Sequence, residues 1–549
     1  MGNEETTVVP TERELHAFEL NDPATAELVA RAQQAVEADR NLKLMEALKK
    51  YKTAVFWAMI LSWALVMEGY DVVVINSFFG QTQFKNRFGT YDEATGTKLI
   101  TAPWQSGLAN SALVGQIAGL AINAYAQDRF GCRRTTMVFM VWMICAIFIP
   151  FFAPSLPVLA FGEAMCGIAW GVFQTLTATY ACELVPIVLR PYVTSYVCMC
   201  WGIGICISSG VIRGVADIHG DLGWRLPFAL QWVWPVPMII VAYLAPESPW
   251  NSVRRNNIEE ARRSLERLAG NSENKKEEVE ATLAYIRYTT EMERAETEGA
   301  SFFDCFRGTN LRRTEINCVV WAAQILCGNP LLSYAVVFLQ AVGFDEIQAF
   351  NTNIALSVCI VVGVFICWFM FPHLGRATIY MSGLSFIFVT LILIGGLAFH
   401  NTKGSQMAQA ILLILSTLVN YSTLGPGCYP IVSETPSGRL RYKTIAIGRF
   451  VYNLTNIFQN AITPRMLSPT AWNWGGKAAL FYAGTNLLCN LWCWFRLPET
   501  KGRSFGEIDL LFEHKISARK FKSTKVDQFA HQTNYETKLD HAGNAAHVE

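Results

Sequence analysis

Two carboxylates stand inside one long apolar stretch of this chain. Residues 54–80 read AVFWAMILSWALVMEGYDVVVINSFFG, with Glu68 and Asp71 inside it. About 20 mostly apolar residues suffice to cross a bilayer, and a carboxylate at that depth costs roughly 2.5 kcal/mol or more. Three residues apart, the two share one helix face, and two such close carboxylates resist ionising together. This pattern is typical of a proton relay. The alternative is a solvated helix end, which fits Glu68 better than Asp71.

The composition is that of a polytopic membrane protein. The 549 residues are 52% hydrophobic and only 16% charged, against about 25% charged in soluble domains. The 16 Trp residues suit bilayer interfaces. A net charge of +1 gives no electrostatic case for nucleic acid.

The sequence also argues against an enzyme, a cofactor or a metal site. Most of the 15 Cys residues lie singly in apolar segments, where they read as small buried apolar side chains. Cys489 and Cys493 share a helix face, but no His or carboxylate in that segment completes a metal site. No nucleophile–base constellation or phosphate-binding loop is recognisable.

Hydropathy predicts an all-α membrane protein with twelve transmembrane helices. The spans are expected at about 54–77, 105–126, 135–153, 157–182, 191–212, 227–245, 315–340, 350–371, 377–399, 407–431, 443–465 and 478–496. The longest polar break contains the helical patterns IEEARRSLERL and KKEEVEATLAYIRYTTEMERAE. The chain is therefore divided into an N-terminal tail 1–50, a six-helix bundle 51–245, a helical linker 246–314, a second six-helix bundle 315–497 and a tail 498–549.

Basic residues indicate the orientation. They cluster before the first span, between spans 2 and 3, throughout 250–313 and after residue 500, and all of these segments fall on one side of twelve alternating spans. The positive-inside rule then places both termini in the cytosol.

An internal repeat supports two six-helix halves. Glu183 precedes Arg190 by seven residues, and Glu434 precedes Arg441 by seven. PESP begins at residue 246 and PETK at residue 498. The Glu–Arg motif thus recurs after 251 residues and the PESP-like motif after 252. Parallel repeats of this kind place a substrate site midway between the halves.

The charges at the cytosolic helix ends are candidate gates, which would hold the halves in one conformation and break in the other. They are Glu183 and Glu247 with Arg129, Arg133 and Arg190 in the first half, and Glu434 and Glu499 with Arg376 and Arg441 in the second. The alternative is ordinary positive-inside charge with incidental acids.

Five motifs in order resemble the sugar porter family of the major facilitator superfamily. They are DRFGCRR, the Glu183–Arg190 pair, PESP, the Glu434–Arg441 pair and PETKGRSFGEI. More specifically, SFFDCFRGTNLRRTEI, QILCGNPLLSY, PRML and WNWGGK are similar to fungal maltose permeases, which are α-glucoside:proton symporters. The resemblance implies the major facilitator fold.

The resemblance also implies site residues. Asp71 matches the proton-accepting Asp of family symporters. Gln324 and Asn329 match the sugar-binding amides of helix 7, and Tyr334 matches an aromatic that closes over the sugar. Tyr429 replaces a family Trp that stacks on the sugar ring, and Tyr452 and Asn453 match cavity positions of helix 11. Planar amides and aromatic faces suit sugars, although an amide in an apolar span can also serve a helix-to-helix bond.

The chain departs from the family pattern at the proton switch. Glu163 stands where the family has the helix-4 Arg that pairs with the helix-1 Asp, and Cys198 stands near a family Gln. Arg449 lies within the eleventh span and needs a carboxylate or water. We therefore expect Arg449 to pair with deprotonated Asp71, Glu68 or Glu163. Snorkelling to the headgroups is the alternative.

The sequence as a whole predicts proton-coupled uptake of maltose or related α-glucosides across the plasma membrane by alternating access. The proton is a co-substrate, and a monomer is expected. The alternatives are a symporter or facilitator for another sugar, such as glucose or a β-linked disaccharide, and a non-transporting sugar sensor. The short tail after residue 500 argues against the sensor.

Overall fold

The structure is a computed structural model. It describes residues 43–92, 96–186, 188–269, 275–297, 301–400, 402–437, 440–503 and 505–526. Most of the predicted N-terminal tail and the end of the C-terminal tail lie outside these ranges.

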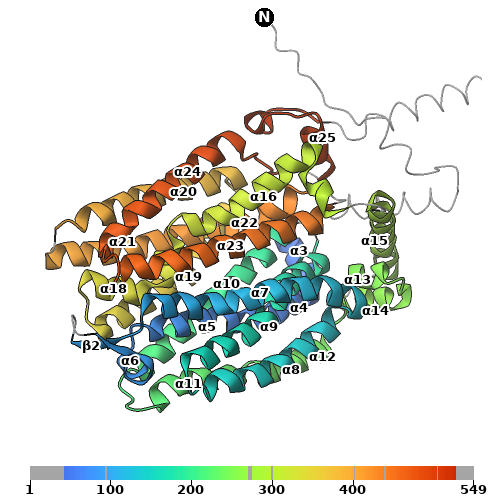
Figure 1. Cartoon of the computed structure of the whole chain (residues 1–549). Helices are drawn as coiled ribbons and strands as arrows, with labels where there is room; N and C mark the ends of the chain where they lie inside the picture. The colour runs from blue at the N-terminus through green and yellow to red at the C-terminus, as the bar shows by residue number, and fades with distance from the viewer. Residues whose placement is uncertain are drawn as a thin grey trace, which may run out of the picture.

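The first half of the chain supplies six spans. They are α4 (Lys52–Ser62) with α5 (Ala64–Phe78), α7 (Ala102–Phe130), α8 (Cys132–Phe151), α9 (Leu156–Leu184), α10 (Arg190–Val215), and α11 (Leu222–Leu230) with η1 (Gln231–Val233) and α12 (Pro235–Leu244). In Figure 1 these blue and green helices form the lower layer.

The second half supplies six more spans, drawn yellow to red in the upper layer of Figure 1. They are α16 (Gly308–Leu326) with α17 (Asn329–Ser333) and α18 (Ala335–Val342), α19 (Glu346–Met370), α20 (Arg376–Leu397), α21 (Lys403–Ser422) with α22 (Leu424–Glu434), α23 (Arg441–Leu467), and α24 (Ala478–Arg496). The predicted all-α fold with twelve spans is confirmed.

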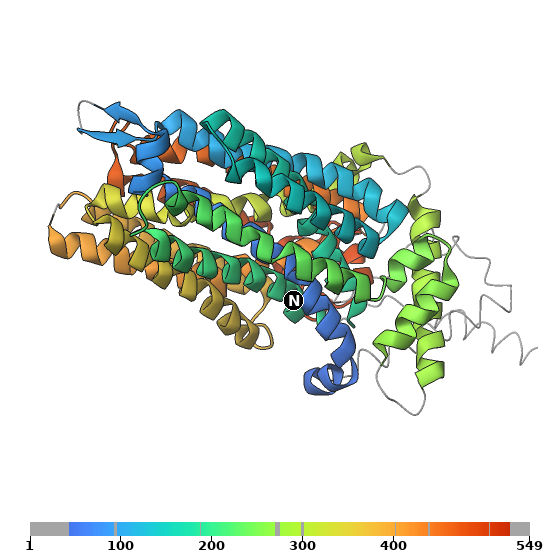
Figure 2. The same ribbon diagram turned by 90° about the horizontal axis from the view of Figure 1, so that it is seen from below.

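Short elements mark the two ends of the bundle, which Figure 2 separates clearly. The linker end carries α3 (Leu44–Lys50), α13 (Pro249–Arg254), α14 (Ile258–Leu268), α15 (Lys275–Thr297), η2 (Phe302–Phe306), α25 (Phe505–Glu513) and η5 (Ala518–Lys520). The hairpin end carries α6 (Thr82–Phe88), the antiparallel strands β1 (Thr90–Asp92) and β2 (Thr97–Leu99), and η4 (Gly475–Lys477).

Three spans are interrupted at prolines, which the sequence reading treated as continuous. A proline has no N–H for the carbonyl four residues earlier. Pro330 therefore leaves the carbonyl of Leu326 without its helical donor, and the Thr485 hydroxyl donates to that carbonyl instead at 2.7 Å. Pro426 follows the interruption at Thr423, and Pro235 follows the 3₁₀ turn η1. Gln231 lies in one of these interruptions, and Asn329 begins the helix that follows another.

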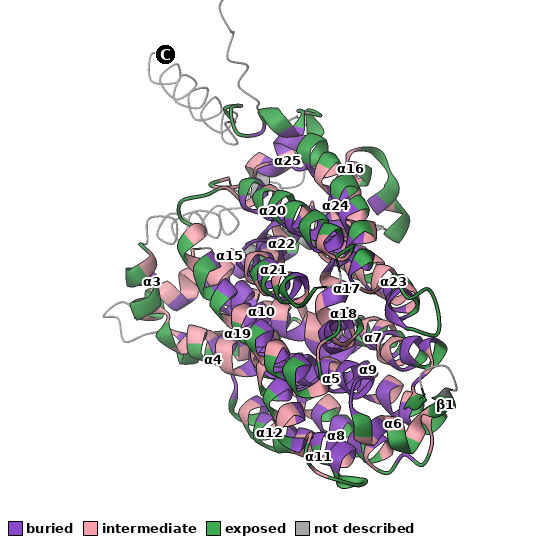
Figure 3. Cartoon of the chain, turned by 90° about the vertical axis from the view of Figure 1, so that its left-hand side faces the viewer, coloured by how far each residue is buried: buried purple, intermediate pink, exposed green. Residues whose placement is uncertain are grey.

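Eight helices or helix pairs of the described residues are long and apolar enough to cross a membrane by composition alone. In the other four spans, the helix is broken or carries more polar residues. Figure 3 shows buried residues gathered between the helices and exposed residues around the rim. Exposed large apolar side chains such as Phe369, Phe495 and Leu488 suit contact with lipid.

Glycines fuse α7 to α9. A β-carbon at Gly115 or Gly119 would overlap the backbone oxygen of Ala164 or Ile168, and Gly167 and Gly171 of α9 make the reciprocal close approach to α7. Small residues spaced four apart on both helices permit such contact inside a membrane.

The chain after span 12 is partly folded, although the sequence suggested only a polar tail. Residues 505–526 turn back and cover the base of α16, with Ile508, Leu511, Phe512 and Phe521 buried. Arg313 of α16 is 2% exposed and forms an ion pair with Asp509.

Candidate functional site

The Glu68 carboxylate is buried at the centre of the bundle. It lies on α5 with 4% exposure. The Gln116 side-chain amide of α7 donates to its Oε1 at 3.3 Å, and the Gln174 amide of α9 donates to the same oxygen. Trp201 of α10 lies within hydrogen-bonding reach. A buried carboxylate is stable only with such donors.

Asp71 and Glu163 form a buried pair of carboxyls. They are 2% and 1% exposed, and they lie within hydrogen-bonding reach of each other. Because an ionised carboxylate only accepts, the two can bond only when one carries a proton. The Gln231 amide of η1 also donates to Asp71, while neither oxygen of Glu163 has another partner among the described residues. The pair is suited to hold a single proton.

Arg449 of α23 approaches this group from the other half. Its Nε donates to the Gln174 Oε1 at 3.0 Å. Its guanidinium carbon lies 4.7 Å from the ring centre of Trp321 and 4.3 Å from that of Tyr452, which is cation–π distance.

The expected direct pairing of Arg449 with an acid is wrong in this conformation. No ion pair joins it to Glu68, Asp71 or Glu163 in the described part of the chain; the Gln174 amide stands between Arg449 and Glu68. Snorkelling is not observed either, because the guanidinium is held inside the bundle by two rings and an amide.

Sequence reasoning missed three glutamines of this site: Gln116, Gln174 and Gln231. A signal was available, because each is an amide within an apolar span, the same signal that singled out Gln324. The sequence does not show which acid each amide faces, because this depends on how α7, α9 and η1 pack around α5.

Three aromatic rings stand beside Arg449. Trp321 of α16 makes edge contacts with Tyr429 of α22 and Tyr452 of α23, at ring-centre distances of 5.5 and 5.4 Å. Two of the predicted sugar-site residues thus come together, around a Trp that the sequence reading did not select. Trp321 precedes Gln324 by three residues and therefore shares its helix face.

The helix-7 amides do not lie on one continuous helix, because α16 ends before Gly328, whose φ is +104°. The Gln324 amide donates at 3.2 Å to the carbonyls of Leu424 and Gly425, where α22 begins. Asn329 opens α17 and is half-buried. Gln324 therefore makes the helix-to-helix bond that was the alternative reading.

Tyr334 and Asn453 are fully buried. The Tyr334 ring stacks on Phe79 of the first half, with centres 6.2 Å apart, and its hydroxyl has no partner among the described residues. Asn453 of α23 is 0% exposed, and neither its Oδ1 nor its Nδ2 is hydrogen-bonded within that part of the chain. Unpaired buried amides are rare in folded proteins.

At the linker end, Glu247 and Glu499 hold equivalent positions in the two halves. Glu247 accepts hydrogen bonds from the backbone N–H groups of Cys132 at 2.8 Å and Arg133 at 3.3 Å, where α8 begins. Glu499 accepts from the N–H of Arg376 at 2.8 Å, where α20 begins. A carboxylate at a helix N-terminus is favourable. Burial raises the pKa of Glu247, and its backbone donors counteract that shift.

Glu183 and Glu434 also match each other. Glu183 accepts from the Ser248 hydroxyl and forms an ion pair with Arg254 of α13. Glu434 accepts from the Thr500 hydroxyl at 2.5 Å and lies 3.8 Å from the Arg376 Nε. The repeated glutamate of the sequence thus makes a similar set of contacts in each half, a hydroxyl and an arginine, but the arginine comes from a different position in each half.

Several expected gate pairs are not formed. Arg129 donates to the Tyr125 hydroxyl, and Arg133 donates to the carbonyls of Ala242 and Tyr243. Arg190 forms no ion pair within the described ranges, and Arg254 takes the place expected for it beside Glu183. Arg441 opens α23 at the same end.

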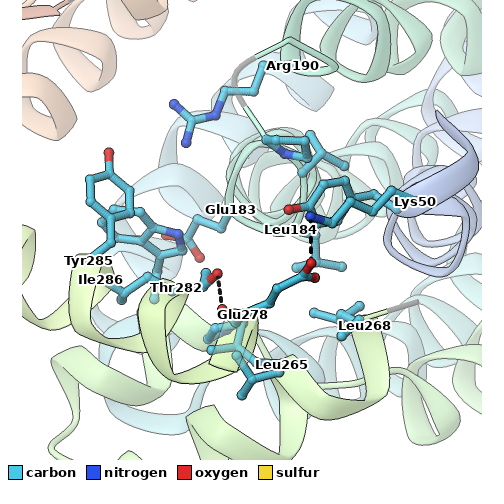
Figure 4. A pocket seen from close by; sticks show the side chains of 17 residues that line it. Lys50, Glu183, Leu184, Arg190, Leu265, Leu268, Glu278, Thr282, Tyr285 and Ile286 are labelled. Atoms are coloured by element: carbon cyan, nitrogen blue, oxygen red, sulfur yellow. Dashed lines mark hydrogen bonds and ion pairs between the residues drawn. The ribbon is translucent and has the colours of Figure 1, made fainter. Parts of the chain in front are cut away.

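Arg190 and Glu183 line a cavity of about 90 Å³ between the end of α9 and the linker helices. Figure 4 shows Arg190 at its upper edge and Glu183 on its wall. Lys50 of α3 forms an ion pair with Glu278 of α15 at 3.1 Å across the cavity. The linker is therefore attached to the segment before span 1 as well as to α9.

The halves contact each other at the hairpin end. The Gln340 amide of α18 donates to the Gly80 carbonyl at 3.2 Å. Glu346 of α19 accepts from the N–H of Thr82 at 3.3 Å and from its hydroxyl at 2.5 Å. Together with the Phe79–Tyr334 stack, these contacts bridge the halves at this end.

Comparison with known proteins identifies the family. Residues 57–512 match the model of the family described as "Sugar (and other) transporter". The chain is 36% identical over 528 residues to maltose permease MAL61 of Saccharomyces cerevisiae, covering 95% of this chain and 85% of that protein. It is 39% identical over 503 residues to the general alpha-glucoside permease of the same yeast, covering 91% and 81% of the two proteins.

Solved structures show the same fold. The proton:xylose symporter XylE bound to 6-bromo-6-deoxy-D-glucose superposes with a TM-score of 0.71, at 20% identity, over 84% of this chain and all of that chain. XylE from E. coli in an inward open conformation gives a TM-score of 0.65 at 20% identity, over 83% and 99% of the two chains. The chain thus has the fold of the major facilitator superfamily and belongs to the sugar transporter family, so it is a membrane transporter of sugars and not an enzyme.

Proposed function

We propose that this transporter carries maltose or a related α-glucoside into the cell together with a proton. The observation that supports it best is the buried group of Glu68, Asp71 and Glu163 facing Arg449 from the opposite half. Carboxyls buried in a membrane protein cost free energy, and their usual use is an ion pathway or proton relay. The yeast relatives are named for maltose and α-glucosides, which motivates the choice of sugar.

The proposed proton carrier is the Asp71–Glu163 pair. One proton shared between the two carboxyls leaves the pair with one negative charge, and a second proton removes it. We expect the sugar-loaded halves to move only after this charge is neutralised, so that the proton gradient drives accumulation. A sugar or a proton can shift the conformational equilibrium only by its different affinity for the two states.

The proposed sugar site lies beside Arg449. Trp321, Tyr429 and Tyr452 offer aromatic faces to the C–H side of a sugar ring, and the free Asn453 amide offers a donor and an acceptor to a pair of hydroxyls. Asn329 and Tyr334 stay candidates on the side toward the hairpin end. In the proposed mechanism the halves rock about this site, opening it alternately to each end.

We propose a plasma-membrane monomer with the linker end in the cytosol, because Lys49, Lys50 and Lys52 and the basic linker helices gather there. The segments 51–245 and 315–497 then move as two bundles, joined by the cytosolic linker 246–314.

The test is sugar-triggered proton movement in yeast cells that lack their own maltose transporters and express this chain. Adding maltose should raise the external pH, and Asp71→Asn should abolish that rise while the protein stays at the cell surface. Asn keeps the shape of the side chain and a hydrogen-bonding amide but cannot bind a proton.

Other outcomes favour the alternatives. Maltose entry without a proton signal would identify a facilitator. Proton movement with glucose or a β-linked disaccharide, and none with maltose, would change the substrate. No transport of any sugar by a surface-expressed chain would favour a sensor.

A further inference from the structure

Gln174 connects the carboxylate site of one half to the cation of the other. Its side-chain Nε2 donates to Glu68, and its Oε1 accepts from the Arg449 Nε at 3.0 Å. Within the described residues, no other side chain forms hydrogen bonds with both. Gln116 is a useful contrast, because it donates to the same Glu68 oxygen at 3.3 Å and has no bond to Arg449.

The chemistry of the two partners fixes the orientation of this amide. An arginine side chain only donates hydrogen bonds, and an ionised carboxylate only accepts them. The Gln174 carbonyl must therefore face Arg449 and its NH₂ must face Glu68. Bonds to charged groups are stronger than neutral ones, so the chain of bonds is strongest when Glu68 is ionised.

The bond to Arg449 crosses the interface between the halves. Gln174 is on α9 of the first half, which is fused to α7, and Arg449 is on α23 of the second. If the halves separate here, Gln174 keeps its bond to Glu68, and Arg449 keeps the Trp321 and Tyr452 rings of its own half. The Arg449–Gln174 hydrogen bond can thus break while Glu68 and Arg449 each keep other partners.

We propose that Gln174 is a positioning residue for coupling. It holds Arg449 close to Glu68 in this conformation. Glu68 lies three residues from Asp71 of the proposed proton-carrying pair, on the same face of α5, so the relative position of the halves depends on the charge of this acidic group. The proposal rests on the proposed function, because it concerns coupling to a proton. Loss of Gln174 should therefore uncouple proton movement from sugar movement, without preventing the sugar from binding.

The test compares Gln174→Met with Gln116→Met in the same cells. Met keeps the length of Gln and removes its polar atoms, and both variants remove one donor to Glu68. Only Gln174→Met cuts the link to Arg449. Maltose accumulation driven by the proton gradient is measured over a range of external pH, beside maltose exchange at equal concentrations on both sides, which needs no net proton movement.

We expect Gln174→Met to lower steady-state accumulation about tenfold, which corresponds to about 1.4 kcal/mol, and to change its dependence on pH, with exchange retained. Gln116→Met should give a clearly smaller loss. The titratable and charged groups that face this link are Glu68, Arg449, Asp71, Glu163, Tyr452, Cys198 and Cys428.

Equal losses in the two variants would overturn the proposal, because Gln174 would then serve only as a donor to Glu68. Normal accumulation in Gln174→Met would overturn it as well. Absence of proton coupling in the wild-type chain would instead refute the proposed function, and this inference with it. If Gln174→Met fails to reach the surface, Gln174→Asn, which is too short to reach both partners, is judged by the same criteria.

Discussion

At the scale of single residues, the most informative side chain is one that lacks partners. Asn453 is 0% exposed and its amide is not hydrogen-bonded among the described residues. Leaving such a group unpaired costs about 1–3 kcal/mol. A cost of this size is understandable where a ligand later supplies the bonds, so the unpaired amide supports its assignment to the sugar site. Asn486 of α24 is equally buried and unpaired but lies outside that site.

We predict opposite effects of Asn453→Leu on stability and on sugar affinity. Leu has the same branched arrangement of heavy atoms and no polar atoms. The free energy of unfolding of the purified protein should therefore rise by about 1 kcal/mol, and its melting temperature should rise with it. Losing neutral hydrogen bonds to sugar should raise the KM for maltose several-fold. Asn486→Leu should stabilise the protein and leave that KM unchanged. Equal KM values in the two variants would remove Asn453 from the site.

At the scale of elements, the segment 505–526 is part of the folded second half. Arg312 of α16 donates to the Ile516 carbonyl at 2.7 Å and lies over the rings of Phe512 and Phe521. The neighbouring Arg313 pairs with Asp509, and the side chains of that pair are 3% and 30% exposed. A charge this deeply buried depends on its partner.

Asp509→Ala should therefore destabilise the protein. It leaves Arg313 buried without its carboxylate, at a cost of about 2 kcal/mol once the partial exposure of Asp509 is allowed for. The control is Glu315→Gln. Glu315 pairs with Arg496, whose side chain is 45% exposed, and losing such a pair should cost less than about 1 kcal/mol. Thermal melting of the two purified variants measures the difference, and equal melting temperatures would show that residues 505–526 do not stabilise α16.

At the scale of the whole molecule, the structure shows the two halves in contact with each other at the hairpin end. The hairpin-end contacts leave no space at Gly80, where a β-carbon would lie 2.7 Å from the Val336 Cγ1. This is closer than side chains tolerate, so a larger residue there requires Val336, or the second half that carries it, to shift away from Gly80.

Gly80→Leu should favour the conformation that is open at the hairpin end. In the proposed orientation that end faces outward, so maltose should still bind from outside while its uptake falls at least about tenfold, for a shift of about 1.4 kcal/mol. Gly210→Leu is the control, because nothing lies within 4 Å of a β-carbon at that position. Equal uptake by the two variants, measured with radiolabelled maltose, would contradict this account of the closure.

Much of this architecture could be predicted from the sequence. The twelve spans follow from long apolar runs, and the two halves follow from motifs such as Glu183–Arg190 and Glu434–Arg441. The membrane carboxylates Glu68 and Asp71 are conspicuous because charge is so costly there. The sequence also predicts that Arg449 belongs to the same site, although it does not show the Gln174 amide that lies between Arg449 and Glu68.

The partners of these residues could not be predicted, because they depend on how helices distant in sequence pack together. Arg190 was expected beside Glu183 from spacing alone, whereas Arg254 reaches it because α13 folds back under α9. The interruptions at Gly328 and Thr423 turn Gln324 toward backbone carbonyls. A sequence shows which groups need a partner, and only the packing shows which partner each one has.

The fusion of α7 to α9 has a mechanical consequence for the transporter. A helix pair in backbone contact bends much less than two helices separated by side chains, so it acts as one stiff beam. Gln116 is attached to this beam from one helix, and Glu163 and Gln174 from the other. When the first half tilts, these three side chains must therefore move as one rigid group, with their spacing unchanged. Arg449, held by the Trp321 and Tyr452 rings, lies on the opposite side of the interface and is not attached to this pair of helices.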